Sequence, residues 1–235
     1  RMIVHLKKRK VFVLFNSNGI LLDEKRQNAI IDTGLDELRI SLDAASPQGY
    51  RRIRNSNKFN QIAQNLRTFL TLQKDHRVVT PRLSIWFLGT KENIAELPDL
   101  LRLAADIGMG ELHLQRLVYF QDHEGYGVAR CEDTLQGSND TDLGLIHNSR
   151  LLAAQLGIRF NASGLGNPIE SVQADSAAIM PWRKCYRPQT LMYITANANV
   201  LPCCISPFST IDYSSILLGN AFKSSLAEIW SGPKY

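Results

Sequence analysis

Residues 37–47 read ELRISLDAASP, and this stretch joins a predicted strand, its polar end and the start of a helix. The segment from Glu37 to Leu42 is predicted to be a strand. Ser46 and Pro47 are typical of a helix N-cap followed by the first helical residue. Ser41 and Asp43 therefore fall at the carboxyl end of the strand, just before a helix begins.

The order of strand then helix continues on both sides of this stretch. We predict strands at residues 11–15, 37–42, 82–88, 112–118 and 158–160, and helices at 23–31, 46–54, from Phe59 past Leu70, 94–107 and 143–156. Residues 11–15 are all apolar, which predicts a strand covered on both faces. Alternation of this kind implies βαβ units with parallel strands. It fits an α/β protein, either a TIM-like barrel or part of one, or an open doubly wound sheet.

The pattern breaks in two places. Residues 119–140 are polar and rich in glycine, which predicts a long loop of the kind that often has a functional role. The second break, at 163–180, is where we place a domain boundary. Beyond it, 191–195 and 200–204 predict a β-hairpin, with its turn at Asn197-Ala198-Asn199 because asparagine tolerates a positive φ.

The composition excludes several classes of protein. A hydrophobic share of 44% and a charged share of 21% are those of a soluble globular protein. The net charge of +5 is mild and its residues are scattered, so we expect no nucleic-acid surface. We expect no membrane segment, because no apolar stretch approaches ~20 residues. The cysteine usage favours the reducing cytoplasm. Because the chain starts at Arg1 in what reads as mid-helix, we interpret it as an internal piece of a longer protein.

Three of the four cysteines fall near the C-terminus. Cys185 precedes the predicted hairpin, and Cys203 and Cys204 lie in its second strand. Thiolates are strong ligands for iron and zinc, although buried, inert cysteines are also common, and the spacing alone leaves both interpretations open. Neighbouring strand residues point to opposite faces, so we favour Cys203 as the ligand over Cys204.

Several predicted strands carry polar residues or glycine at or near their carboxyl ends, where barrels and open sheets bind ligands. Asn18 and Gly19 follow the first strand, Ser41 and Asp43 end the second, Thr90 and Asn93 follow the third, and Gln115 lies in the fourth. Asp43 could accept two hydrogen bonds from a ribose diol. The alternative, that each residue only caps a loop or makes a turn, stays open. The five histidines are dispersed and suggest no catalytic geometry.

A series of short motifs runs in order through nearly the whole chain. Asn16-Ser-Asn18-Gly19 with Leu21-Leu22 resembles the TNG-x-LL segment of radical S-adenosylmethionine (SAM) enzymes, and 34–44 resembles the strand that follows it. Tyr50-Arg-Arg-Ile-Arg54 continues the resemblance. The C-terminal motifs resemble the SPASM or "twitch" module, which binds an auxiliary cluster; they are Cys185, Leu201-Pro-Cys203, Gly219-Asn220 and Ile229-Trp230.

This resemblance implies a fold and a division into domains. The fold would be a partial (β/α)6 barrel followed by a small, cysteine-containing hairpin module. We expect the later βα units of the barrel in residues 1–178. The SPASM-like module would occupy residues 179–235.

The resemblance also implies cofactors and chemistry. Such an enzyme cleaves SAM reductively at a [4Fe–4S] cluster, and the 5′-deoxyadenosyl radical abstracts hydrogen from a substrate. The cofactors would be that cluster, SAM and an auxiliary iron–sulfur cluster. A peptide or protein substrate and an electron donor protein are the partners implied.

By position in these motifs, the cofactor-binding residues would be Asn18, Gly19, Ser41, Asp43, Arg54, Asn93 and Gln115. Ser41 and Asp43 would face the ribose and methionine parts of SAM, and Arg54 would reach the SAM carboxylate. Cys185, Cys203 and Cys204 are the candidate ligands of the auxiliary cluster.

The chain departs from the family pattern at two points. It contains neither the C-x3-C-x2-C loop that binds the catalytic cluster nor the Gly-Gly-Glu segment that grips SAM, and both are expected upstream of Arg1. We therefore expect the piece alone to be inactive. Two alternatives remain: a non-catalytic barrel that binds a nucleotide-like ligand or a partner, and a zinc-stabilised α/β protein.

Overall fold

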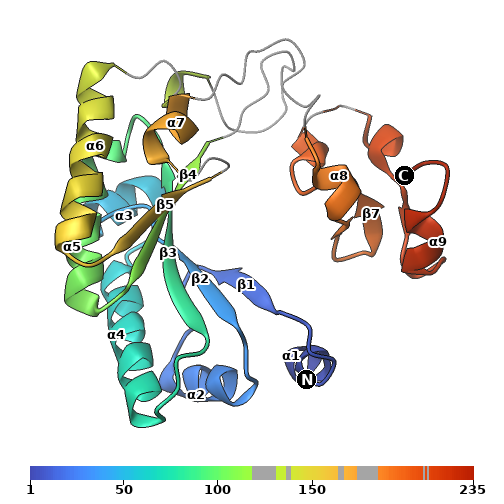
Figure 1. Cartoon of the computed structure of the whole chain (residues 1–235), viewed down its shortest axis with the longest axis horizontal. Coiled ribbons are helices and arrows are strands. Elements are labelled where there is room, and N and C mark those ends of the chain that lie inside the picture. Colours follow the sequence, from blue (N-terminus) through green and yellow to red (C-terminus); the bar gives the residue numbers. More distant parts are fainter. Residues whose placement is uncertain (118–130, 136–138, 164–166, 174–184, 209, 211) are drawn as a thin grey trace. The chain divides into compact units, whose positions relative to one another are not determined.

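The computed structural model describes residues 1–117, 131–135, 139–163, 167–173, 185–208, 210 and 212–235. The chain divides into two compact units (Figure 1). One comprises residues 1–117 and 133–174, and the other comprises 118–132 and 175–235. The domain boundary predicted between residues 178 and 179 lies outside the described residues, as does most of the predicted 119–140 loop.

The first unit is built on a parallel sheet. Its strands lie in sequence order and are β1 (Leu14–Ser17), β2 (Glu37–Ser41), β3 (Arg82–Gly89), β4 (Glu111–Arg116) and β5 (Arg159–Ala162). A doubly wound sheet reverses its strand order at a switch point. The described strands show no such reversal, so the sheet is part of a TIM-like barrel.

Helices connect the strands in the expected alternation. They are α2 (Glu24–Asp32), α3 (Pro47–Arg54), α4 (Phe59–Asp75), α5 (Leu97–Ile107), α6 (Asp140–Gln155) and the short α7 (Pro168–Gln173), with α1 (Met2–Lys7) before β1. The predicted N-cap at Ser46 is confirmed, because its side chain accepts a hydrogen bond from the Gly49 amide, and Asp23 caps α2 in the same way by accepting from the Arg26 amide. Figure 1 shows α4, α5 and α6 along one face of the sheet.

The core lies between this face and the helices. Alternate strand residues such as Ile40, Ile85 and Leu112 are fully buried, together with Leu66 and Phe69 of α4. Successive strand residues point to opposite faces. The intervening residues therefore form a second face, which we call the polar face; it carries Arg39, Ser41, Ser84, Trp86, His113 and Gln115.

The prediction for the first strand is wrong in two respects. β1 begins at Leu14 rather than Val11, and it is not covered on both faces, because Phe12 is 63% exposed and Leu14 is 38% exposed. The physical reason is position. Among the described strands, β1 pairs with β2 alone, so it forms an edge of this sheet.

A row of alternating charges crosses the amino-terminal ends of the strands. Glu37 of β2 pairs with Arg82 of β3, at 2.6 Å. Arg82 and Arg159 each lie 3.1 Å from the same oxygen of Glu111. Glu37 also accepts a hydrogen bond from Arg39 at 2.5 Å. Burial alone would raise the pKa of Glu37, but the hydrogen bonds from the two arginines outweigh burial and lower it.

The second unit contains a small antiparallel sheet, β6 (Tyr193–Ile194), β7 (Asn199–Leu201) and β8 (Gly219–Asn220), with helices α8 (Arg187–Thr190) and α9 (Leu226–Trp230). The predicted hairpin is confirmed by the pairing of β6 with β7. Gly219 lies close against α9, because a Cβ at this position would be 2.9 Å from Ile229 Cγ1. A capping box formed by Ser225 and Glu228 begins that helix.

Two details of the hairpin differ from prediction. The positive φ of the turn, 65°, falls on Ala198 and not on either asparagine. The second strand ends at Leu201, because Pro202 has no amide hydrogen to extend the ladder. Cys203 and Cys204 therefore lie beyond the strand, and the argument that alternation separates them does not apply. Among the described helices, none is long and apolar enough to cross a membrane.

Replacing Glu37 by Gln should lower the free energy of unfolding by about 2 kcal/mol, because it leaves Arg39 without its buried anionic partner and Arg82 with Glu111 alone. Since the pKa of Glu37 is lowered in the fold, its contribution is fully present above the ordinary value of 4.5 and is lost as the pH falls through the folded value. The wild-type and variant stabilities should therefore converge in acid. Asp75→Asn, an exposed control, should change stability by less than about 0.5 kcal/mol. Equal effects of the two substitutions would contradict this account.

Replacing Ala198 by Gly should raise the melting temperature of the second unit, because glycine adopts a positive φ without the cost of about 1 kcal/mol that other residues incur. The same substitution at Ala227, in the exposed part of α9, should lower stability by roughly 0.5–1 kcal/mol. Calorimetry of both variants tests the turn geometry. Destabilisation at both positions would show that Ala198 is not strained.

Candidate functional site

The candidate site lies at the carboxyl ends of β1 to β4. Ser41 ends β2, Gly89 ends β3, and Gln115 is the penultimate residue of β4. Parallel strands bring these ends to one edge of the sheet. Of the described residues, the polar side chains at this edge form two groups. In the first, the bound group, the side chains form hydrogen bonds or ion pairs with other residues of the chain. In the second, the open group, the side chains have no such partner.

Asp43 belongs to the bound group. It is 3% exposed and follows β2 directly. Its Oδ1 accepts a hydrogen bond of 2.8 Å from the Leu88 amide of β3, and its Oδ2 forms an ion pair with Arg54 at the end of α3. Both carboxylate oxygens therefore have partners in the protein. These contacts join β2, β3 and α3, as the loop-capping interpretation expects.

Asn93 is bound even more completely. Its amide nitrogen donates to the carbonyl oxygens of Asp43, at 3.1 Å, and Leu88, at 2.9 Å. Its amide oxygen accepts from the amide and the hydroxyl of Thr90. Asn93 is 1% exposed, so it joins the end of β2 to the loop after β3. We call this set of contacts, made by Asp43 and Asn93, the β2–β3 brace.

Asn18 and Gly19 form a turn after β1. The Asn18 side chain accepts a hydrogen bond from the Ile20 amide. Gly19 has a φ of +73°, and its carbonyl oxygen accepts a 2.8 Å hydrogen bond from Asn65 of α4. A Cβ on Gly19 would lie 3.0 Å from Ile62 Cγ2. This close approach, together with the positive φ, requires glycine at position 19.

Ser41 and Gln115 form the open group. Ser41 is partly exposed, Gln115 is exposed, and both lie on the polar face. Within the described parts of the chain, neither side chain has a hydrogen-bond partner. Of the seven predicted cofactor-binding residues, these two have side chains with no partner among the described residues, while the exposed Asn18 amide nitrogen and the remaining Arg54 N–H groups are also free to meet a ligand.

Sequence reasoning missed a stack of side chains beside Ser41. The rings of Trp86 and His113 are stacked with centroids 4.0 Å apart and an interplanar angle of 18°, and the Arg39 guanidinium lies 4.2 Å from the centre of a Trp86 ring. Strand register places Ser41, Trp86 and His113 in one row. The alternation of residues along β3 and β4 indicates that Trp86 and His113 share a face with Ser41, but the stack can be predicted from it only if the register of the two strands is known.

The environment of His113 keeps its ring neutral. Burial lowers the pKa of His113, and the positive charge of Arg39 lowers it further. One ring nitrogen lies 3.3 Å from the Ser163 hydroxyl. At neutral pH the two stacked rings are therefore uncharged, and the charge beside them is that of the Arg39 guanidinium.

Sequence reasoning also missed Glu96, which fixes the start of α3. Its carboxylate accepts a 2.9 Å hydrogen bond from the Ala45 amide and pairs with Arg52 at 2.9 Å. A Cβ on Gly49 would collide with this carboxylate. Glu96 thus holds the segment that carries Asp43 into α3, and a glycine at position 49 makes room for it.

The cysteines of the second unit fit a metal centre in part. Cys185 and Cys203 are half-buried free thiols, and Cys204 is exposed. The Cys203 carbonyl oxygen accepts a hydrogen bond from the Ser206 hydroxyl at 2.8 Å, which fixes the backbone after β7. A [4Fe–4S] cluster held by cysteines alone takes four of them. In the described part of the chain, no three cysteine, histidine or acidic side chains form a metal-binding group. These cysteines can contribute ligands but do not complete a site by themselves.

Comparison with known proteins finds one family model that matches the C-terminal residues and one relative that matches most of the chain. The SPASM family model, described as an iron-sulfur cluster-binding domain, matches residues 185–235. The PqqA peptide cyclase of Gluconobacter oxydans is 24% identical over 225 residues, which cover 92% of this chain and 54% of the cyclase.

Solved structures show the same fold along the chain. SuiB of Streptococcus suis, bound to the precursor peptide SuiA, superposes with a TM-score of 0.70 at 14% identity and covers 99% of this chain and 50% of SuiB. The enzyme anSMEcpe with bound AdoMet and Cp18Cys peptide superposes with a TM-score of 0.60 at 13% identity, over 94% of this chain and 57% of that protein. The chain spans about half the length of these proteins.

Substitutions of Asp43 should separate its two contacts. Asp43→Asn can still accept from the Leu88 amide but loses the ion pair with Arg54, so it should lower the free energy of unfolding by about 1 kcal/mol. Asp43→Ala loses both contacts and leaves the buried Leu88 amide unpaired, which should cost about 3 kcal/mol. Denaturant unfolding of the two variants checks this order. Equal stability of wild type and Asp43→Ala would show that Asp43 does not join the strands.

Proposed function

Because the chain belongs to the radical SAM enzymes that carry a SPASM module, we propose that it forms part of an enzyme that modifies a peptide or protein. The observation that carries this proposal is the order of parts: a partial barrel followed by a cysteine-bearing module, matched over 92% of the chain by a peptide cyclase. SuiB and anSMEcpe, which have the same fold, have been solved with bound peptides.

The cofactors of this family are SAM and iron–sulfur clusters, as the sequence resemblance implies. When bound and reduced, the catalytic cluster supplies the electron that cleaves SAM into methionine and a 5′-deoxyadenosyl radical. We infer that the residues of this chain bind SAM and orient it. Ser41 and Gln115 offer free polar atoms at the carboxyl edge, and the β2–β3 brace keeps Ser41 at a fixed position.

The contacts of the remaining predicted residues support a positioning role. Asp43 and Asn93 hold the edge together, and Arg54 is bound through its ion pair with Asp43. Gly19 allows the turn after β1 to lie against α4. Asn18 accepts a hydrogen bond from the Ile20 amide in the same turn. We propose that these five residues shape the SAM site, and that Arg54 also reaches the SAM carboxylate with the N–H groups that Asp43 does not use.

The second unit would hold the auxiliary cluster. Cys185 and Cys203 are the proposed ligands, since both thiols are half-buried in the matched segment. We propose a domain boundary between residues 178 and 179, and a separate electron donor protein as the source of reducing equivalents.

The test of this function uses the full-length protein, reconstituted with iron and sulfide without oxygen and reduced with dithionite. Addition of SAM should give 5′-deoxyadenosine, and a peptide encoded beside the gene is the first substrate to assay. With SAM and dithionite present, formation of 5′-deoxyadenosine requires the catalytic cluster but neither the auxiliary cluster nor the peptide. An iron-loaded protein that forms no 5′-deoxyadenosine would therefore contradict the proposal.

Cys203→Ala in the full-length protein should reduce the iron content without abolishing 5′-deoxyadenosine formation, because it removes a ligand of the auxiliary cluster only. Cys131→Ala serves as the matched control and should leave the iron content unchanged. Iron analysis with electron paramagnetic resonance checks both variants. Unchanged iron in Cys203→Ala would exclude Cys203 as a ligand.

A further inference from the structure

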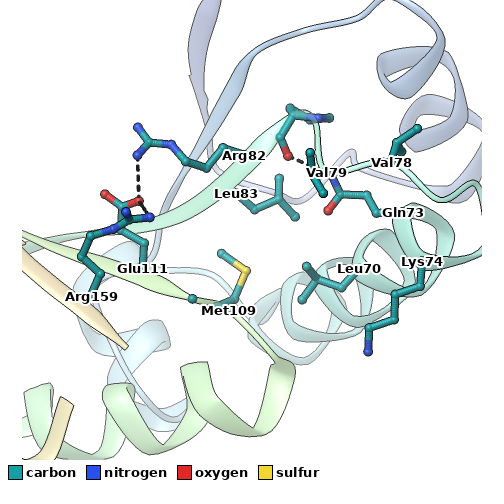
Figure 2. Close-up of a pocket in the computed structure, with 12 residues that line it drawn as sticks. Leu70, Gln73, Lys74, Val78, Val79, Arg82, Leu83, Met109, Glu111 and Arg159 are labelled. Atoms are coloured by element: carbon teal, nitrogen blue, oxygen red, sulfur yellow. Dashed lines mark hydrogen bonds and ion pairs between the residues drawn. The ribbon is translucent and has the colours of Figure 1, made fainter. Parts of the chain in front are cut away.

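A cavity of about 300 Å³ opens at the amino-terminal ends of β3, β4 and β5 (Figure 2). Its wall is formed by α4, by the loop from α4 to β3, and by the turn before β4. This is the edge of the sheet opposite to Ser41 and Gln115. A cavity of this size lies at the lower end of the range for small-molecule sites, so it suits a small ligand rather than a chain segment.

The interior of the cavity is apolar. Leu83 and Met109 are 7% and 2% exposed, and Leu70 of α4 faces the same space in Figure 2. Gln73 lines the cavity beside them, and its amide nitrogen donates to the Pro81 carbonyl oxygen at 2.8 Å. The apolar surface open to water belongs to Val79, which is 89% exposed, and to the half-buried Leu70 and Val78. A hydrocarbon body of a ligand would displace water from this surface, which favours binding.

The rim on one side carries two guanidinium groups held together. Arg82 Nη1 and Arg159 Nη2 both lie 3.1 Å from the same oxygen of Glu111 (Figure 2). Each guanidinium has five N–H donors, and in the described contacts Arg159 uses only one of them. Glu111 thus fixes two arginine side chains beside each other while leaving donors free.

The charges that line the cavity do not balance. Three cationic side chains, Lys74, Arg82 and Arg159, line it against a single carboxylate, that of Glu111. The carboxylate of Glu37 forms an ion pair with Arg82, but it also pairs with Arg39, so its negative charge is shared between two arginines. Lys74 has no ion-pair partner in the described parts of the chain. The cavity therefore combines an apolar interior with a rim that favours an anion.

We propose that this cavity binds a small carboxylic acid with an apolar body. The carboxylate would lie against Arg82 and Arg159, whose planar forks match its two oxygens, and the apolar body would lie against Leu70, Val78 and Val79. The pairing with Glu111 pre-organises the arginines, so little side-chain freedom is lost when the ligand binds.

Octanoate is the probe that tests this proposal, titrated into the full-length protein and followed by calorimetry. Octylammonium has the same hydrocarbon chain with the opposite charge. Octanoate should bind saturably and at least about tenfold more tightly than octylammonium. Equal affinities, or no saturable binding of octanoate in the millimolar range, would overturn the proposal.

Two pairs of variants locate the site. Lys74→Gln with Arg159→Gln removes two exposed charges from the rim and leaves Glu111 paired with Arg82, so the fold should persist. This pair should weaken octanoate binding about tenfold. The control, Lys25→Gln with Arg150→Gln, removes the same charge from exposed positions on α2 and α6 and should have no effect. Equal weakening in both pairs, or in neither, would place octanoate elsewhere and overturn the proposal.

Discussion

The arrangement of the first unit depends on one set of contacts, the brace between the ends of β2 and β3. The backbone hydrogen bonds between β2 and β3 end at the Leu42 amide, which donates to the Trp86 carbonyl oxygen at 3.1 Å. Beyond that point the chain must leave the sheet, and its amides and carbonyl oxygens need other partners. Asp43 and Asn93 supply them, with four hydrogen bonds to Leu88 and Thr90 and one to the Asp43 carbonyl oxygen. A buried carboxylate and a buried amide thus define the shape of the edge where a ligand would bind.

The β2–β3 brace explains why some polar residues at this edge hold the backbone in place while others have free atoms for a ligand. A side chain whose atoms are all bonded to the protein can fix geometry but offers no free donor or acceptor, as is the case for Asn93. Ser41 of β2 and Gln115 of β4 lie on the polar face with free polar atoms. On the same face, Trp86 of the intervening strand β3 stacks on His113 of β4. The edge therefore combines a rigid frame with a few open groups, which is the general design of a site that must orient its ligand.

Local signals in the sequence predicted much of the fold. The cap at Ser46 depends on neighbouring residues only, and it is confirmed. The exposure of β1 depends on whether another strand covers it, which an apolar run does not reveal. The stack of Trp86 on His113 depends on the register of strands far apart in sequence. For Asp43, residue type predicted a polar strand end, but only the positions of Leu88 and Arg54 show that its oxygens are occupied.

The comparisons favour the enzyme family over a zinc-stabilised protein or a non-catalytic barrel. The central claim is that Ser41 and Gln115 meet the ligand while Asp43 and Asn93 only hold the edge. A crystal structure of the full-length protein with bound SAM tests it most directly. We predict hydrogen bonds from SAM to Ser41 or Gln115, with the Asp43 contacts to Leu88 and Arg54 unchanged. SAM bonded to the Asp43 carboxylate, with Arg54 displaced, would contradict the account.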